Sequence, residues 1–336
     1  MLNWGLVGCG DISNKRVAPA IQAQADSNLL AVMSPYQQEL DGFMEKHQVP
    51  RGYLTMEDMV QDPDIDVIYV ATPIFLHYGI ALQALKAGKH VLVEKPMAMT
   101  VEECETLILE AKNQNRKLGV CYFRRFFPKL AEVKRLIEED EIGQVIQVRI
   151  IFHSNYNPRD DDPKRWRVVK AKAGGGPLWD MGCHKLDMLV DLLGMPQKVY
   201  ALMDTQTYSY EVEDSCSVLM KLESGAHCMA SFNWNSAVWS DEFTILGTKG
   251  KITLLPCDGD GVILERTPRA MRGLGAEVTT VGIPNHANVH APLVDDFARA
   301  LIEGREPRIS GIEGMKTNRI LAAIEESAVT GKEISL

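Results

Sequence analysis

The chain has 336 residues, of which 46% are hydrophobic and 24% charged, and its formal net charge is −9. This length predicts two domains, and the scattered, net acidic charge argues against nucleic acid or an anionic membrane as a partner. The first residues lack a signal-peptide pattern, no apolar run reaches the length of a membrane span, and the seven cysteines have neither paired nor metal-ligand spacing. We therefore expect a cytoplasmic protein with reduced thiols and no metal.

The beginning of the chain predicts a dinucleotide-binding turn. An apolar strand at residues 3–7 runs directly into the Gly-Cys-Gly-Asp-Ile-Ser segment at 8–13, and a helical pattern follows as far as residue 21. In such a turn the glycines allow a tight bend and the close approach of a pyrophosphate, and a small third residue lets the helix pack on the strand. The helix N-terminus then offers free N–H groups to the phosphates. We expect Gly8, Gly10, Asp11 and Ile12 to bind the cofactor.

The end of the second expected strand, residues 29–33, indicates whether the cofactor is NAD(H) or NADP(H). Its end normally carries an acid that binds the adenosine ribose hydroxyls, but here Ser34 stands there, followed by Pro-Tyr-Gln. Without a carboxylate nothing repels a 2′-phosphate, and the Ser34 hydroxyl offers it a donor. No arginine follows nearby, so only Lys15 and Arg16 supply positive charge. We expect NADP(H) to be preferred, with NAD(H) as the alternative.

Helices and strands go on alternating as far as residue 122. We expect a helix at 55–61, a strand at 67–71, a turn at 72–73, a helix at 77–87, a strand at 91–93 and a strand at 118–122. Between the last two strands, Thr100 and Glu103 have the spacing of a capping box for a helix ending near residue 113. This alternation predicts a parallel, doubly wound sheet with helices on both faces. We therefore place a Rossmann domain at residues 1–122.

The pattern changes after residue 126. A helix is expected at 128–139, strands at 198–203, 216–222, 226–234, 242–246, 251–255 and 262–266, and final helices at 289–303 and 311–330. Strands without intervening helices predict an α+β domain at 123–336 with a mainly antiparallel open sheet, one face of which is covered by helices. We expect the terminal helix to pack back on the first domain. The other sheet face, near Trp234, Trp239 and Phe243, is expected to pair with a second subunit in a homodimer or homotetramer.

A glycine-rich segment before the strands introduces a polar helix face. Three glycines at 174–176 lead into a helical pattern in which Asp180, His184 and Asp187 follow i, i+4, i+7 spacing among apolar residues. That spacing places the three side chains on one face. A buried acid and imidazole must be hydrogen-bonded to each other or to a ligand. Taken alone, the pair is more often a core histidine with its carboxylate, and the cofactor turn together with Lys95 favours catalysis.

These motifs resemble the Gfo/Idh/MocA family (glucose–fructose oxidoreductase, inositol dehydrogenase and rhizopine catabolism) of NAD(P)-dependent oxidoreductases. The markers are Gly-Cys-Gly at 8–10, Ala-Thr-Pro at 71–73 with His77, the strand ending in Glu-Lys-Pro at 94–96, and the Gly-Gly-Gly and Asp-Met-Gly-Cys-His segments at 174–176 and 180–184. Within the family, residues 31–34 and the Trp-Arg pair at 166–167 are similar to NADP-dependent sugar reductases. The chain departs from them at Gln37 and Gln38, where those enzymes usually carry an arginine.

The resemblance implies that Lys95, Asp180 and His184 are catalytic and line a cleft between the domains. His184 has the reference pKa of a proton carrier near neutral pH, Asp180 orients its ring, and Lys95 brings positive charge to the reacting oxygen. It further implies cofactor contacts from Ser34, Ala71, Thr72, Pro73, Leu76, His77, Glu94, Lys95, Trp166 and Arg167, and substrate contacts from Tyr122, Arg124, Asp187 and His290. For His77, a purely structural role at the start of its helix is an equally good interpretation. For Arg167, the alternative to a cofactor contact is a salt bridge with an acid.

The expected function is an NAD(P)-dependent dehydrogenase or reductase that acts on a sugar, a cyclitol or a related polyhydroxy carbonyl compound. Two alternatives stay open. One is a hydrolase or epimerase that uses transient oxidation by a tightly held nicotinamide. The other is a non-catalytic sensor of the dinucleotide, because a fold alone does not specify a function.

Overall fold

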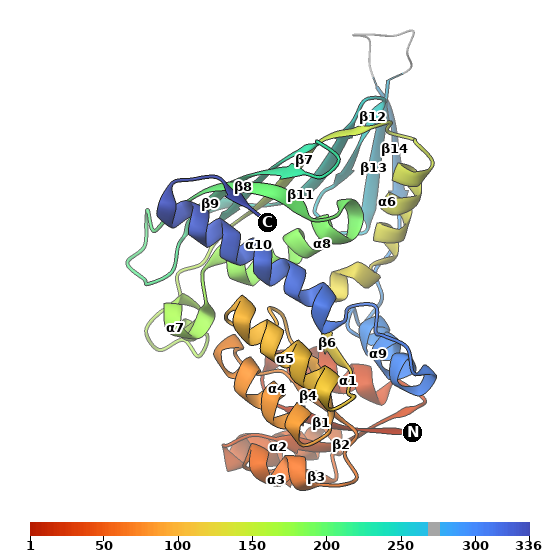
Figure 1. The fold of residues 1–336 in the computed structure, drawn as a ribbon, viewed down its shortest axis with the longest axis vertical. Coiled ribbons are helices and arrows are strands. Elements are labelled where there is room, and N and C mark those ends of the chain that lie inside the picture. Colours follow the sequence, from red (N-terminus) through yellow and green to blue (C-terminus); the bar gives the residue numbers. More distant parts are fainter. Residues whose placement is uncertain (268–275) are drawn as a thin grey trace. The chain divides into compact units, whose positions relative to one another are not determined.

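The computed structural model describes residues 1–267 and 276–336, which form two compact units (Figure 1). The first unit contains residues 1–126 and 286–318, and the second contains residues 127–285 and 319–336. This division differs from a single boundary at residue 122, because the segment 286–318 clusters with the first unit. Within the described ranges, no helix has the length and apolar character needed to cross a bilayer.

A six-stranded sheet forms the centre of the first unit, with strand order β3-β2-β1-β4-β5-β6. Every neighbouring pair in it is parallel. The strands are β1 (Leu2–Val7), β2 (Ser27–Met33), β3 (Arg51–Tyr53), β4 (Val67–Val70), β5 (His90–Val93) and β6 (Leu118–Val120). β4 is buried along its whole length, as expected of a parallel strand with helices on both faces. The predicted Rossmann fold is confirmed.

The connections in this unit are helical, and the capping box before α5 is present. Thr100 Oγ1 accepts a hydrogen bond from Glu103 N at 3.2 Å, and Glu103 Oε2 accepts one from Thr100 N at 3.3 Å. One helix, α2 (Gln37–His47), was not expected from the sequence, although Leu40 and Phe43 are buried on its inner face. The other helices are η1 (Ser13–Val17), α1 (Ala18–Gln22), α3 (Met56–Gln61), η2 (Ile74–Leu76), α4 (His77–Lys86), α5 (Val101–Asn113), η3 (Phe123–Phe126) and α9 (Ala291–Glu303).

Glycines on β6 and at the start of the last helix explain why the segment 286–318 joins the first unit. A Cβ at Gly119 would lie 2.7 Å from the ring of Phe297 in α9. The centre of that ring lies 6.0 Å from the ring centre of Trp4. A Cβ at Gly314 would lie 2.4 Å from the side chain of Val120. The late segment therefore packs where two residues lack side chains, and this close packing brings His290 into the first unit.

The second unit is built on a nine-stranded sheet with the order β14-β13-β12-β11-β7-β10-β9-β8-β15. Its strands are β7 (Val145–Asn155), β8 (Pro196–Asp204), β9 (Ser215–Leu222), β10 (His227–Asn233), β11 (Asn235–Gly247), β12 (Gly250–Leu254), β13 (Gly261–Arg266), β14 (Glu277–Gly282) and β15 (Ile334–Ser335). β7, which the sequence analysis did not predict, is the central strand and pairs in parallel with β10. The remaining pairs are antiparallel, which confirms the expected mainly antiparallel sheet.

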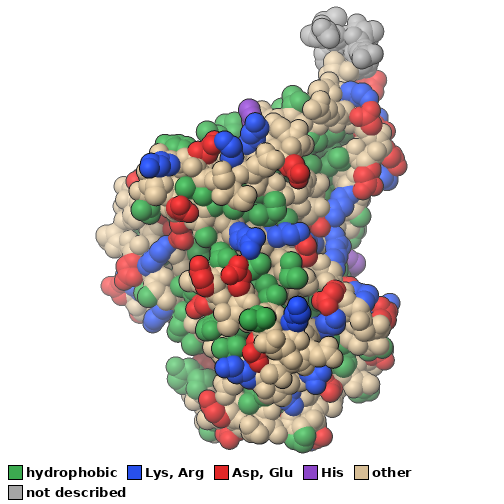
Figure 2. Space-filling model, in the orientation of Figure 1, with side chains coloured by type: hydrophobic (Ala, Val, Ile, Leu, Met, Phe, Trp, Pro, Cys, Tyr) green, Lys and Arg blue, Asp and Glu red, His purple; other side chains and the backbone are tan. Residues whose placement is uncertain are grey.

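Helices cover one face of this sheet, with α8 (Cys183–Leu193) and part of α10 (Gly311–Thr330) lying beneath its strands (Figure 1). The remaining helices are α6 (Pro128–Glu138), η4 (Arg165–Val168), α7 (Lys170–Ala173) and η5 (Leu178–Gly182). Ser327 Oγ of α10 accepts a hydrogen bond from Ala201 N of β8 at 3.0 Å. Acidic and basic side chains are interspersed over the face shown in Figure 2.

The uncovered sheet face carries different aromatic and aliphatic residues from those expected. Trp234 and Phe243 are buried, so they belong to the core, and only Trp239 of the three is exposed. The outward residues are instead Tyr200, Leu202, Leu219 and Met229, which are 39%, 59%, 54% and 45% exposed. Tyr200 pairs with Leu219, and Leu219 with Met229, across three neighbouring strands. These pairs form a continuous apolar row.

Candidate active site

The turn after β1 has the geometry that a pyrophosphate needs. Gly8 has a φ of +104°, and a Cβ there would lie 2.8 Å from the carbonyl oxygen of Ala71, so only glycine fits. An added Cβ at Gly10 would meet no atom within 4 Å, which means that the space beside this residue is open. Asn14 Nδ2 donates to the carbonyl oxygen of Cys9 at 2.8 Å and holds the turn. Asp11 and Ile12 open the helix that follows, where free N–H groups favour phosphate.

The loop after β4 lies beside that turn. Thr72 follows Ala71 there, and its buried Oγ1 has no hydrogen-bond partner among the described residues. Pro73 precedes η2, and Leu76 at the end of η2 is 39% exposed. An open glycine turn and an unpartnered hydroxyl at adjacent strand ends fit a dinucleotide, which binds at the carboxyl ends of parallel strands.

His77 joins two loops of this edge. Its Nδ1 lies 2.9 Å from the carbonyl oxygen of Pro96, and its Nε2 lies 2.8 Å from that of Thr72. Burial is the main cause that lowers the pKa of His77, and the two carbonyl contacts act in the opposite direction. Because both ring nitrogens are engaged by backbone, this side chain positions the loops that carry Thr72 and Lys95.

A buried hydrogen-bonded network surrounds Glu94, the residue before Lys95. Tyr69 OH donates to Glu94 Oε1 at 2.9 Å, and His290 Nε2 lies 3.5 Å from the same oxygen. Burial opposes the charged carboxylate, but His290, Tyr69 and the nearby positive charge of Lys95 together hold the pKa of Glu94 below its ordinary value. Cys121 Sγ donates to Tyr69 OH at 3.1 Å. Glu94 is therefore a fixed anion beside Lys95.

Three further predicted residues gather in the same unit around η3. Tyr122 is fully buried, and Arg124 is 4% exposed with its guanidinium 5.0 Å from the ring centre of Phe123. The ring of His290 stacks on Phe123 with 4.6 Å between ring centres. His290 thus connects η3 with Glu94, although some 170 residues of sequence separate it from η3.

In the second unit, the three glycines make room for Trp179. A Cβ at Gly174 or Gly175 would lie 2.6 or 2.2 Å from its indole ring, and Gly174 also has a φ of +79°. A Cβ at Gly176 would lie 2.0 Å from the carbonyl oxygen of Glu213. The glycines are therefore required for packing at the start of the helix that carries Asp180 and His184.

Glu213, which the sequence analysis missed, caps that helix. Its Oε1 accepts a hydrogen bond from Leu178 N at 3.3 Å, and Gly176 also donates to it. Burial outweighs these hydrogen bonds and raises the pKa of Glu213 to about 7. The only sequence signal was an acid within a turn-rich stretch, which does not reveal a partner some 35 residues away.

We expect Glu213→Gln to flatten the pH dependence of unfolding. With an ordinary value of 4.5 and a folded pKa of about 7, the folded state keeps a proton that the unfolded state loses between these values. Its stabilising contribution is complete below pH 4.5 and disappears as pH rises through 7, at most roughly 3 kcal/mol. Urea melts from pH 4.5 to 8 measure this slope. Glu223→Gln, at an exposed turn, should keep the wild-type slope, and an unchanged slope in Glu213→Gln would contradict the prediction.

Asp180 and His184 lie on a helix that begins with a wider turn than the sequence predicted. Residues Leu178–Gly182 form a π-helical turn, which is followed by α8. Asp180 keeps 27% of its side chain exposed, whereas His184 is 4% exposed and Asp187 is fully buried. The three side chains therefore differ in their access to solvent. π-Helical turns often occur at functional sites.

Arg167 and Lys185, two cations of the second unit, differ in their burial and in their partners. Arg167 Nη1 lies 3.5 Å from Asp180 Oδ2, and its guanidinium lies 5.7 Å from the ring centre of Trp166. Lys185, next to His184, is fully buried and pairs with the buried Asp241 at 2.6 Å. Arg167 therefore belongs to the candidate site, and Lys185 to the core.

The end of β2 carries a carboxylate that the sequence analysis did not find. Ser34 is 2% exposed, and its Oγ donates to Glu39 Oε2 at 3.2 Å from the first turn of α2. Burial first, and then the negative charge of Glu39, raises the pKa of Cys9 to about 11. Cys9 lies between the two glycines of the turn, so this effect shows that the negative charge of Glu39 lies within electrostatic range of the turn. The signal for α2 was the spacing of Leu40 and Phe43.

Comparison with known proteins gives matches over both units. Residues 2–122 match the profile of an oxidoreductase family with an NAD-binding Rossmann fold, and residues 130–253 match the GFO/IDH/MocA C-terminal domain. Oxidoreductase P35 of Formosa agariphila is 30% identical over 254 residues, which are 75% of this chain and 78% of the relative. The 1,5-anhydro-D-fructose reductase of Ensifer adhaerens is 27% identical over 99% of this chain and 98% of its own.

Solved structures agree with these matches. The aldose–aldose oxidoreductase of Caulobacter crescentus, crystallised with glycerol, is 29% identical and superposes with a TM-score of 0.88. The alignment covers 100% of this chain and 99% of that chain. The similarity therefore extends over both units.

Proposed function

The chain belongs to the Gfo/Idh/MocA family of NAD-binding oxidoreductases, and we propose that it transfers a hydride between a nicotinamide cofactor and a sugar, a cyclitol or a related polyhydroxy carbonyl compound. The observation that carries this proposal is the open glycine turn at the end of β1, in a chain that matches the family over both units. Relatives named as a sugar reductase and an aldose oxidoreductase support the substrate class.

When bound, the nicotinamide exchanges a hydride with the carbinol carbon of the substrate. In this proposal His184 takes the proton from the hydroxyl of that carbon, or returns it, because its reference pKa lies near neutral pH. Asp180 orients the imidazole and stabilises its charged form. Lys95 places a positive charge at the oxygen on which negative charge develops, and the carboxylate of Glu94 lies beside it in sequence.

The remaining predicted residues are proposed to hold the cofactor and the substrate. Gly8, Gly10, Asp11 and Ile12 would receive the pyrophosphate, and Thr72 would donate its buried hydroxyl. The other proposed cofactor contacts are Ser34, Ala71, Pro73, Leu76, His77, Glu94, Trp166 and Arg167. The proposed substrate contacts are Tyr122, Arg124, Asp187 and His290. The cofactor residues of the first unit are supported by their position at or after the strand ends, and the substrate residues by the burial of their polar groups. Trp166 and Arg167 lie on η4 instead.

Glu39 favours NAD(H) over NADP(H). The sequence-based expectation of NADP(H) depends on the absence of an acid at residue 34, yet the carboxylate of Glu39 reaches the Ser34 hydroxyl at 3.2 Å. A carboxylate at this end of β2 accepts hydrogen bonds from the free ribose hydroxyls and repels a 2′-phosphate. Lys15 Nζ pairs with Asp11 Oδ1 at 3.4 Å, and this carboxylate weakens the attraction of Lys15 for a 2′-phosphate. We therefore place the preference of this chain with NAD(H).

A panel of sugars and polyols, followed through the absorbance of the reduced nicotinamide, tests the proposed reaction. We expect turnover with at least one polyhydroxy compound and dependence on added cofactor. Cofactor that survives dialysis, together with hydrolysis or epimerisation without net reduction, would support the redox-assisted alternative. Dinucleotide binding without turnover on the whole panel would support the sensor.

We propose that the apolar row of Tyr200, Leu219 and Met229 packs against a second copy of the chain. Exposed apolar surface of this kind commonly marks a protein interface. Light scattering at micromolar concentration should show a dimer or tetramer. Leu219→Glu should shift the protein towards monomer, because a carboxylate would be buried without a partner. The same change at the exposed Leu109 of α5 is the control, and a wild-type monomer would contradict the proposal.

The proposed location is the cytoplasm, which stays a prediction. Six of the seven cysteines are buried. Burial raises the pKa of Cys104 and of Cys228 to about 12, so both thiols remain protonated. Protonated, buried thiols react slowly, which suits a protein whose cysteines serve in packing.

A further inference from the structure

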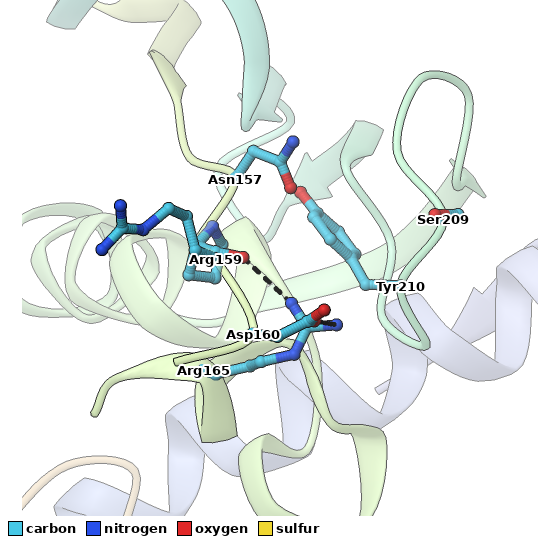
Figure 3. Close-up of a pocket in the computed structure, with 7 residues that line it drawn as sticks. Asn157, Arg159, Asp160, Arg165, Ser209 and Tyr210 are labelled. Atoms are coloured by element: carbon cyan, nitrogen blue, oxygen red, sulfur yellow. Dashed lines mark hydrogen bonds and ion pairs between the residues drawn. The ribbon is translucent and has the colours of Figure 1, made fainter. Parts of the chain in front are cut away.

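A separate pocket lies in the second unit between two loops (Figure 3). One wall comes from the segment after β7, and the other from the segment that precedes β9. The cavity has a volume of about 370 Å³, which is near the lower end of the range of small-molecule sites, about 300–1,000 Å³. The residues that line it are Asn157, Pro158, Arg159, Asp160, Arg165, Ser209 and Tyr210. This size suits one ring-sized ligand.

Both walls are held in place by hydrogen bonds. Arg165 Nη1 donates to the carbonyl oxygen of Pro158 at 2.9 Å, and its Nη2 pairs with Asp160 Oδ1 at 2.8 Å. The buried carboxylate of Asp214 accepts hydrogen bonds from three successive backbone N–H groups at residues 206–208. Tyr210 OH donates to the carbonyl oxygen of Tyr156 at 3.2 Å and thereby links the two walls. The pocket is therefore preformed.

The charges of the pocket favour a neutral ligand. Arg165 pairs with Asp160, and Arg159 Nε pairs with Asp161 Oδ1 at 3.1 Å. An anion would have to displace a carboxylate from its arginine. Hydroxyl groups both donate and accept, so they can bind beside such pairs without breaking them. Figure 3 shows the amide of Asn157 and the hydroxyl of Tyr210 on the opposite side from Arg165 and Asp160.

Tyr156 connects this pocket with the candidate catalytic residues of the same unit. Its hydroxyl donates to the carbonyl oxygen of Lys164 at 3.2 Å, and its ring centre lies 4.7 Å from the ring centre of Trp234. Burial is the main cause that raises the pKa of Tyr156, while the charges of Arg167 and Asp180 also act on its phenol. The helix η4 carries both Arg165, which lines the pocket, and Arg167, which lies 3.5 Å from Asp180. The pocket therefore lies close to Asp180.

We propose that this pocket binds a neutral polyhydroxylated ring, the non-reacting sugar of a glycoside or disaccharide substrate. This proposal rests on the proposed function for the reaction at the other ring. It predicts that substrates with two rings bind more tightly than their component monosaccharides, because only the larger ligands fill the pocket.

The test blocks the pocket without removing a contact. Ser209 lines the pocket, so Ser209→Trp should fill it, and Gln206→Trp, on the same loop but outside the lining, is the matched control. Calorimetry with maltose, cellobiose, lactose, sucrose, glucose and galactose should find at least one disaccharide that binds at least tenfold more tightly than its monosaccharides. Ser209→Trp should abolish that advantage, and Gln206→Trp should keep it. Thermal melts show that both variants fold.

The outcomes separate this proposal from the proposed function. Disaccharide binding that Ser209→Trp abolishes, in a protein without turnover, would keep the pocket and refute the reaction. Turnover with no advantage for any disaccharide, or an advantage that Ser209→Trp leaves intact, would refute the pocket and keep the reaction. Binding of inorganic phosphate that competes with disaccharide and is lost in Ser209→Trp would instead identify an anion site and overturn the proposal.

Discussion

His184→Ala should lower kcat by about 10²–10⁴-fold, the usual loss for a general acid or base, while the Kd of the dinucleotide stays within a few-fold of wild type. In the proposed mechanism His184 acts on the reacting oxygen, and an interaction made mainly in the transition state appears in kcat. Lys95→Met should show a loss of similar type. Asp180→Asn should be milder, because the imidazole is retained and only its orientation and basicity change. Single-turnover rates and dinucleotide titrations measure the two effects separately.

His153→Ala is the matched control for this series. His153 is a half-buried histidine of β7 whose Nε2 lies 2.9 Å from Ser231 Oγ, so its loss should affect melting temperature more than rate. A purely structural role for His184 predicts a different pattern, in which melting temperature, dinucleotide binding and activity fall together. Near-normal rates in a folded His184→Ala protein would move the proton transfer to Lys95 first and then to Tyr122.

The first unit was largely predictable because its signals are local. Apolar strands that end in glycine turns, and a capping box at Thr100 and Glu103, depend on neighbours in sequence. The position of segment 286–318 was not predictable, since it depends on the missing side chain of Gly119 and the ring of Phe297. Such a fit between distant residues leaves no periodic pattern in either segment.

The residues of the candidate site could be proposed from the sequence, whereas their environment could not. The spacing of Asp180 and His184 indicated one helix face, whereas the π-helical turn and the buried cap from Glu213 depend on tertiary packing. β7 was missed because adjacent apolar residues at 150–152 interrupt its alternation. Its central place in the sheet follows from pairing with strands about 80 and 95 residues later, which no local pattern records.

The same limit applies to the proposed cofactor preference. At residue 34 the sequence offers a serine, and the pattern predicts tolerance of a 2′-phosphate. In the NAD(H) proposal, the carboxylate that binds the ribose comes from α2, five residues later, because the chain turns at 35–36 and returns Glu39 to the Ser34 hydroxyl. In this proposal, an acid from the following helix takes the place of an acid on the strand.

Glu39→Arg should reverse the preference of this chain from NAD(H) to NADP(H). In the wild type, we expect the Kd for NADH to be about 10–100-fold lower than that for NADPH, the range for hydrogen bonds to a charged group. The substitution removes the acceptor for the ribose hydroxyls and supplies a cation to the 2′-phosphate. Glu39→Gln should bring the two Kd values close together, because it removes the repulsion and adds no cation. Fluorescence titration of NADH and NADPH on the wild type and both variants measures all six Kd values without any substrate.

The control for charge alone is Glu45→Arg, an exposed glutamate on the same helix. It changes the net charge of the protein by the same amount, so a general electrostatic attraction of NADPH would appear equally in both variants. A local effect of Glu39 predicts that only Glu39→Arg changes the ratio of the two Kd values, and that added salt weakens NADPH binding in that variant more than NADH binding. Two results together would contradict the prediction: a wild type that binds NADPH at least as tightly as NADH, and a Glu39→Gln variant with an unchanged ratio of the two Kd values. The Glu39 carboxylate would then not distinguish the ribose from its 2′-phosphate, and Ser34 would be the next residue to substitute.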